Sequence, residues 1–178
     1  MKFGTQAIAA IALPILLAAP LAAADFHQGR TQLTAEEGGQ ILQVKPGLGP
    51  FERLWVAPGF DGSWGLLKWD PDHSWAVPEA PGDLLDQIRE AVGEINQEPR
   101  EDADLRLSVT VYHFKRQGFL SKPEGHFELV ARNRQGKAVW IAQDRVKRTQ
   151  PPAIIRSDTD SQIMARELQR KIRVSFRK

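Results

Sequence analysis

The strongest periodic signal in the chain is a run of apolar residues that recur every three or four positions: Leu84, Leu85, Ile88, Ala91, Val92 and Ile95. This spacing predicts an amphipathic helix over residues 82–98, with Asp83 as its N-cap and Pro99 as the last position that could end it. Near the C-terminus, the same spacing is followed by Met164, Leu168 and Ile172. It predicts a second helix that starts at about Thr159 or Asp160, after Ser157 and Asp158 as capping residues.

Between these helices the apolar residues alternate with polar ones. The apolar members are Leu105, Leu107, Val109 and Val111. This alternation predicts a strand with one buried face, and His113 continues its register toward the edge of the core. Residues 126–132 and 137–148 are two further strand candidates, joined by a polar hairpin loop at 133–136.

Upstream, residues 41–44 and 52–57 are shorter strand candidates, whereas residues 59–81 are dense in Gly, Pro, Asp and Trp and predict a long loop. The order strand, helix, strand, hairpin, helix is typical of an α+β fold. We expect a two-layer sandwich in which a mainly antiparallel sheet carries both helices on one face. This single domain would span residues 41–178 and follow a flexible arm at 25–40.

The first 24 residues have the pattern of a cleavable signal peptide. Lys2 precedes an apolar run at 8–19, and three alanines at 22–24 offer a cleavage site before Asp25. Two prolines interrupt the apolar run, which is short for a membrane span. We therefore expect cleavage between Ala24 and Asp25, a soluble periplasmic domain and no stable membrane span. The chain has no cysteine, which excludes disulfides and lipid attachment through a thiol.

The charges are nearly balanced in number but uneven in position, with 24 basic and 22 acidic residues overall. Residues 79–104 carry nine acids and two arginines, while residues 145–178 carry ten basic residues and three acids. This distribution predicts two surfaces of opposite sign. The basic candidates to bind an envelope protein or an anionic envelope component are Arg166, Arg170, Lys171 and Arg173.

A structural interpretation of these basic residues stays open. Cations near a helix C-terminus complement the helix dipole. The acidic helix could also neutralise them, either within the fold or across a homodimer. Nucleic acid is not an expected partner in an exported compartment.

The loop predicted at 59–81 supplies a second candidate binding surface, formed by Trp64, Trp69 and Trp75. Indole rings either form an exposed platform for a sugar or peptide, or anchor a long loop to the core. The same loop holds Asp61, Asp70, Asp72 and His73. A carbohydrate-active or other hydrolase that uses these groups beside the tryptophans is therefore the alternative function. Their spacing matches neither a metal site nor a catalytic motif, so we expect a non-enzymatic protein with no metal and no cofactor.

A third hypothesis is a module that caps another exported protein by pairing at a sheet edge. The basic segment at 144–149 favours a protected edge over such pairing, because charged side chains typically guard an exposed strand.

The first part of the mature chain also resembles a known family. The resemblance rests on Leu33, on GGQILQVKPG at 38–47 and on FERLWVAP at 51–58, and the later order of helix, strand and hairpin is similar. These segments resemble the opening of a bacterial envelope family classed as domain of unknown function 3313, most of whose members are lipoproteins. The resemblance implies a fold and a compartment but no catalytic residues. This chain departs from the lipoprotein pattern because it lacks an acceptor cysteine.

Overall fold

The computed structural model describes residues 30–32, 41–43, 45–46, 50–60, 66–95, 105–116, 123–147 and 159–175. The strands of its large sheet are β3 (Lys45–Pro46), β4 (Arg53–Val56), β5 (Leu67–Trp69), β6 (Trp75–Ala76), β7 (Leu105–Lys115), β8 (Glu124–Arg132) and β9 (Ala138–Lys147). The helices are α2 (Leu84–Gly93) and α3 (Asp160–Ser175). A separate pair of strands is formed by β1 (Arg30–Gln32) and β2 (Ile41–Gln43). Part of the expected N-terminal arm therefore pairs as a strand.

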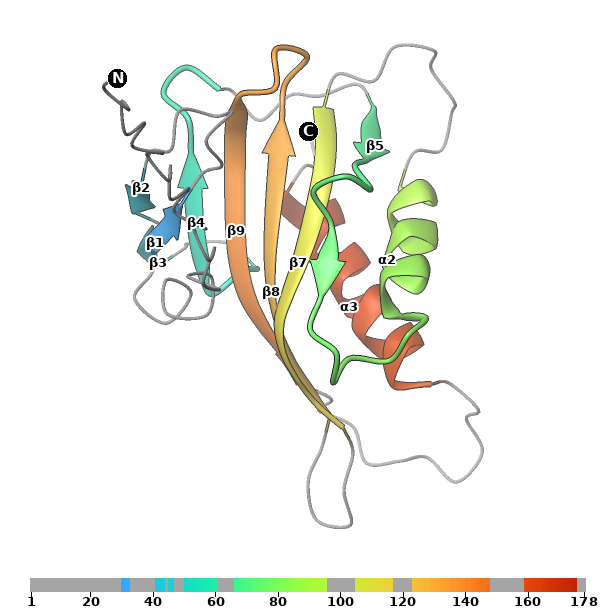
Figure 1. Cartoon of the computed structure of the whole chain (residues 1–178). Helices are drawn as coiled ribbons and strands as arrows, with labels where there is room; N and C mark the ends of the chain where they lie inside the picture. The colour runs from blue at the N-terminus through green and yellow to red at the C-terminus, as the bar shows by residue number, and fades with distance from the viewer. Residues whose placement is uncertain are drawn as a thin grey trace, which may run out of the picture.

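The large sheet has the strand order β3-β4-β9-β8-β7-β5, and β6 pairs with β7 further along the same edge. β5 and β6 run parallel to β7, whereas the other neighbours are antiparallel. Figure 1 shows both helices on the same side of this sheet, with α3 behind the central strands. The α+β fold, with a mainly antiparallel sheet and two helices on one face, is confirmed.

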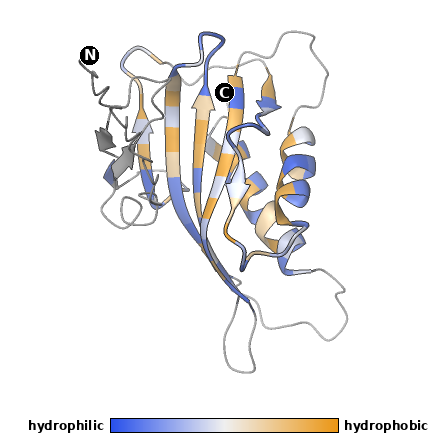
Figure 2. Cartoon of the chain, in the orientation of Figure 1, coloured by the Kyte–Doolittle hydropathy of each residue, from blue (hydrophilic) through white to orange (hydrophobic). Residues whose placement is uncertain are grey.

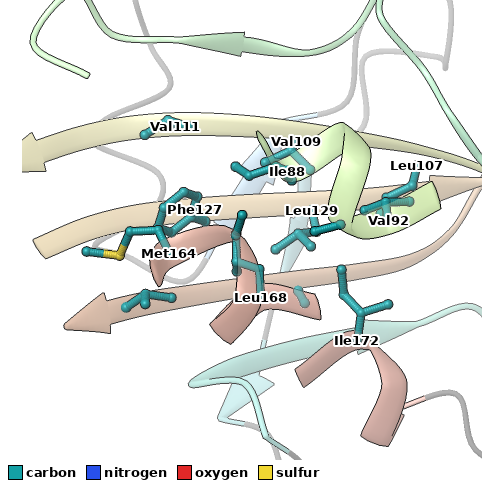
Figure 3. Packing of buried hydrophobic residues seen from close by; sticks show 14 of the residues in the cluster. Ile88, Val92, Leu107, Val109, Val111, Phe127, Leu129, Met164, Leu168 and Ile172 are labelled. Atoms are coloured by element: carbon teal, nitrogen blue, oxygen red, sulfur yellow. The ribbon is translucent and has the colours of Figure 1, made fainter. Parts of the chain in front are cut away.

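The core lies between the sheet and the helices. Alternate residues of β7 and β8, among them Leu107, Val109, Phe127 and Leu129, are fully buried against α2 and α3. Figure 3 shows these side chains pointing toward apolar residues of the helices, including Ile88. Complete burial of such a side chain contributes about 1.5–3 kcal/mol, so this layer supplies most of the stability that a domain without disulfides needs.

The ends of α2 differ from the prediction, whereas α3 begins at Asp160 as predicted. α2 ends at Gly93, five positions before the predicted end, and residues 96–100 lie outside the described part. Asp83 occupies the N-cap position but caps no backbone group, and its carboxylate instead accepts a hydrogen bond from Ser161 Oγ at 2.7 Å. At α3, Thr159 and Gln162 form a reciprocal capping box, while the predicted caps at 157 and 158 lie outside the described residues.

Two sequence predictions for the sheet were wrong. The predicted loop at 59–81 contains β5 and β6, which add a parallel edge to β7. These strands have three and two residues, too few for their alternation to be recognised. His113 does not continue the buried register, because the β7–β8 pairing shifts between Val111 and His113. Phe114 is buried in its place, and His113 is exposed.

Candidate functional site

The face of the sheet opposite the helices carries the candidate site. Lys68, Arg106 and Arg132 are register partners on the adjacent strands β5, β7 and β8, so they form one row across this face. We call these three residues the cationic row. Their side chains point away from the helices, because the leucines that alternate with Lys68 and Arg106 are buried in the core. Lys68 and Arg106 are exposed, whereas Arg132 is only 7% exposed and donates to Ser108 Oγ at 2.7 Å.

The two exposed members of the row are not neutralised within the described part of the chain. No carboxylate there pairs with Lys68 or Arg106, although the two residues lie directly opposite each other. Like charges in this position destabilise a sheet. A pair of adjacent, solvent-exposed cations is well suited to bind an anion, because the bound negative charge offsets their mutual repulsion.

An exposed indole lies on the same face. Trp75 is the register partner of Thr110 on β7, and it is 43% exposed. Its ring packs edge-on against the ring of Tyr112, with 5.8 Å between centroids and 83° between planes. This contact limits the orientations that the indole can adopt.

A buried polar network holds Tyr112. The Tyr112 hydroxyl donates to Glu128 Oε1 at 2.8 Å, and Gln143 Nε2 donates to Glu128 Oε2 at 2.7 Å. Both oxygens of this carboxylate therefore accept hydrogen bonds from neighbouring strands. A satisfied network of this kind stabilises side-chain positions. We infer that it orients the tyrosine, and through it the indole, and leaves the carboxylate without a free oxygen for acid–base chemistry.

The far end of the same face is polar and contains two histidines. Figure 2 shows that β7, β8 and β9 change from mainly hydrophobic to mainly hydrophilic toward the end at which β8 begins. There the rings of His113 and His126 lie 5.0 Å apart, and His126 Nε2 is 3.0 Å from Glu124 Oε1. Burial lowers the pKa of His126, and the nearby charges of His113 and Arg145 act in the same direction. Burial alone would raise the pKa of Glu124, but hydrogen bonds from His126 and Lys147 lower it.

Of the predicted tryptophans, Trp69 and Trp75 lie on opposite faces of the sheet and do not form one platform. Trp64 lies outside the described residues. Trp69 is the partner of Leu107 and packs partly buried against the core on the helix side. Trp75 lies on the opposite face, where its ring is 43% exposed.

The carboxylates of the same segment are also separated. Asp61 lies outside the described residues, and Asp72 is exposed in the turn between β5 and β6. Asp70 is 4% exposed, and its Oδ2 lies 3.0 Å from His73 Nδ1. Ser74 Oγ donates to the Asp70 carbonyl and accepts from the Val109 amide. These contacts tie the turn to β7 and do not form a pair of carboxylates beside an opening.

The basic residues predicted on α3 mostly bond within the fold. Arg170 pairs with Glu167 at 2.6 Å, and Arg173 Nη2 donates to the Glu94 carbonyl at 3.1 Å. Lys171 pairs with Asp144, a fully buried carboxylate on β9. Arg166 is exposed at a groove of about 230 Å³ between the helices. The other polar residues lining this groove include Gln87, Glu90, Glu94, Gln162 and Gln169.

The residues of the cationic row are polar positions in the sequence, but the apolar pattern does not indicate that they lie together. Arg106 is a polar position of the predicted strand, and Lys68 stands between Leu67 and Trp69. Only the parallel pairing of β5 with β7, across almost forty positions, brings the two together. The basic segment at 144–149 was also misplaced as an edge, because its described part belongs to β9, an interior strand between β4 and β8.

No family model and no curated protein matches this chain. Among solved structures it is similar to a PelC variant from Paraburkholderia phytofirmans, solved as a dodecamer, with 14% identity, coverage of 70% of this chain and 94% of that chain, and a TM-score of 0.42. It is also similar to a candidate lipoprotein from Caulobacter crescentus, with 20% identity, coverage of 57% and 85%, and a TM-score of 0.39. These likenesses are too weak to assign a function, and the resemblance to family 3313 stays a prediction.

Two kinds of feature are absent from the described residues. They contain no group of three His, Cys, Asp or Glu side chains that could hold a metal ion. None of their helices is long and apolar enough to cross a membrane.

Proposed function

We propose that this protein is an exported, non-enzymatic binding domain of the bacterial envelope that binds an anionic partner through the helix-free face of its sheet. The observation that carries the proposal is the cationic row, in which Lys68 and Arg106 lie side by side, exposed and without a carboxylate partner in the described part of the chain. Export is supported by the leader pattern at residues 1–24, which lies outside the described residues.

The chemistry of the row favours binding over catalysis. Lysine and arginine supply several N–H donors to phosphate, carboxylate or sulfate oxygens, and they form charge-assisted hydrogen bonds with them. Glu128, a carboxylate on the same face, already accepts hydrogen bonds from Tyr112 and Gln143. The partner can therefore be an acidic envelope protein or an anionic envelope component.

The test compares charge-matched double variants of the exported chain. Binding to inorganic polyphosphate, to polygalacturonate and to phosphatidylglycerol vesicles is measured at low and high salt. We expect Lys68→Gln with Arg106→Gln to weaken binding of the preferred probe by roughly two- to thirtyfold at low salt, because each exposed charge contact contributes about 0.2–1 kcal/mol. The salt dependence of binding should also become shallower.

Two further variants make this result specific. Lys115→Gln with Lys137→Gln removes the same charge from exposed positions elsewhere on the strands and turns, and it should leave affinity nearly unchanged. Arg166→Gln with Arg170→Gln tests the basic helix. The proposal fails if no anionic probe binds, or if the helix variant weakens binding and the sheet variant does not.

A further inference from the structure

The helix-free face carries more than charge, and this bears on the class of ligand. We propose that its partner is an acidic polysaccharide whose charged groups contact Lys68 and Arg106 while one sugar ring stacks on Trp75. This inference rests on the proposed function and specifies its ligand.

The distance between the charged pair, Lys68 and Arg106, and the Trp75 ring requires an extended ligand. Arg106 and Thr110, the partner of Trp75, are four residues apart on β7, which corresponds to about 13 Å along the strand. Both features lie on the same face at the β5–β6 edge. A small anion can contact only one of them, whereas a polymer that runs along the edge can contact both.

The exposed indole adds a preference that a purely electrostatic site lacks. A pyranose ring presents C–H groups on its faces and hydroxyl groups at its rim, and an indole offers a flat apolar surface with one N–H donor. Because the edge contact with Tyr112 holds the Trp75 ring, stacking costs little additional ordering. Charged sugars combine the two groups that this face can bind.

The distribution of exposed apolar side chains argues against a membrane or a protein as the partner. Among the described residues the exposed large hydrophobics are Val56, Trp75 and Val174, which belong to β4, β6 and α3. They do not form one patch. A membrane-binding surface inserts a cluster of apolar groups, and a stable protein interface has an apolar centre. A single exposed indole on the same face as two cations without a carboxylate partner among the described residues satisfies neither requirement.

The experiment measures affinity by calorimetry for polygalacturonate, uncharged dextran, inorganic polyphosphate and phosphatidylglycerol vesicles. We expect polygalacturonate to bind more tightly than any other probe and dextran not to bind. Trp75→Ala should weaken polygalacturonate binding by roughly fivefold and leave polyphosphate binding unchanged. Trp75→Phe, which keeps an aromatic ring, should recover most of the loss.

The outcomes separate this inference from the proposed function. If polyphosphate or vesicles bind through the cationic row and polygalacturonate does not, the saccharide inference is wrong and the proposed function stands. The saccharide inference is also wrong if Trp75→Ala lowers the affinities for polygalacturonate and polyphosphate equally. The indole would then support the structure of the site without contacting a sugar ring. If none of the anionic probes binds, both proposals fail.

Discussion

We expect acid to destabilise this fold through protonation of His126. Its ring is buried beside His113, and burial lowers its pKa below the ordinary value of 6.5. Near that value the unfolded chain therefore binds a proton that the folded chain does not. The stability that the neutral His126 contributes is fully present above the ordinary pKa, and it decreases as the pH falls below that value. We expect the free energy of unfolding in urea to decrease between about pH 7.5 and pH 5.5.

Substitution of this histidine isolates its contribution. His126→Gln keeps a hydrogen-bonding side chain opposite Glu124 but does not titrate, so the decrease with acid should become shallower. His113→Gln is the comparison, because it removes one charge effect on His126 and leaves the larger effect of burial, so it should make the slope shallower by less. An unchanged slope in His126→Gln would show that other groups cause the acid sensitivity.

Gly125 illustrates a constraint that depends on close packing. A methyl group added there would lie 2.5 and 2.6 Å from two ring carbons of Phe127, a fully buried side chain. We expect Gly125→Ala to lower the free energy of unfolding by about 1–3 kcal/mol. Gly93→Ala is the matched control, since nothing lies within 4 Å of the added methyl group, and it should be neutral or stabilising by up to ~1 kcal/mol. Equal effects of the two substitutions in chemical denaturation would contradict this explanation.

At the scale of elements, α3 is joined to the sheet by the ion pair between Lys171 and Asp144. Burial raises the pKa of Asp144, and the Lys171 ammonium opposes that rise. Lys171→Met leaves a buried carboxylate without its cation, so we expect a loss of about 3–5 kcal/mol at neutral pH. Part of this loss should be regained in acid, where Asp144 takes up a proton.

The control is Arg170→Met, which removes an exposed ion pair and should lower the free energy of unfolding by at most about 1 kcal/mol. A similar cost for both variants in urea unfolding would contradict this role.

The elements that could be predicted from the sequence are long and bury only one of their faces. Leu105 to Val111 alternate because one face of β7 meets the helices, and the apolar residues of α2 recur because one side of that helix meets the sheet. β5 and β6 were missed because two or three residues carry no recognisable period. The register shift after Val111 was missed because no glycine or proline in β7 marks it.

At the scale of the whole molecule, the placement of charge depended on which elements are neighbours. The acidic and basic segments were predicted to form two surfaces of opposite sign, with neutralisation within the fold as the alternative, and α2 and α3 pack against each other on one side of the sheet. Gln169 and Arg173 of α3 both bond to Glu94 at the end of α2. The positive charge that has no carboxylate partner among the described residues lies instead on β5 and β7, and neither strand belongs to either charged segment. Such a position follows from strand pairing and could not be read from charge along the chain.

The short parallel edge also determines how the protein should fluctuate. β7, β8 and β9 pair over most of their length, whereas β5 and β6 are tied to β7 by three and two residue pairs. Short ladders open at a lower free energy, so the backbone amides of this edge should exchange with deuterated water before those of β8. Each opening would separate Lys68 from Arg106 and disrupt the proposed binding site. A bound ligand should therefore slow exchange at this edge alone, and a mutation that merely loosens the edge should weaken affinity without touching the ligand.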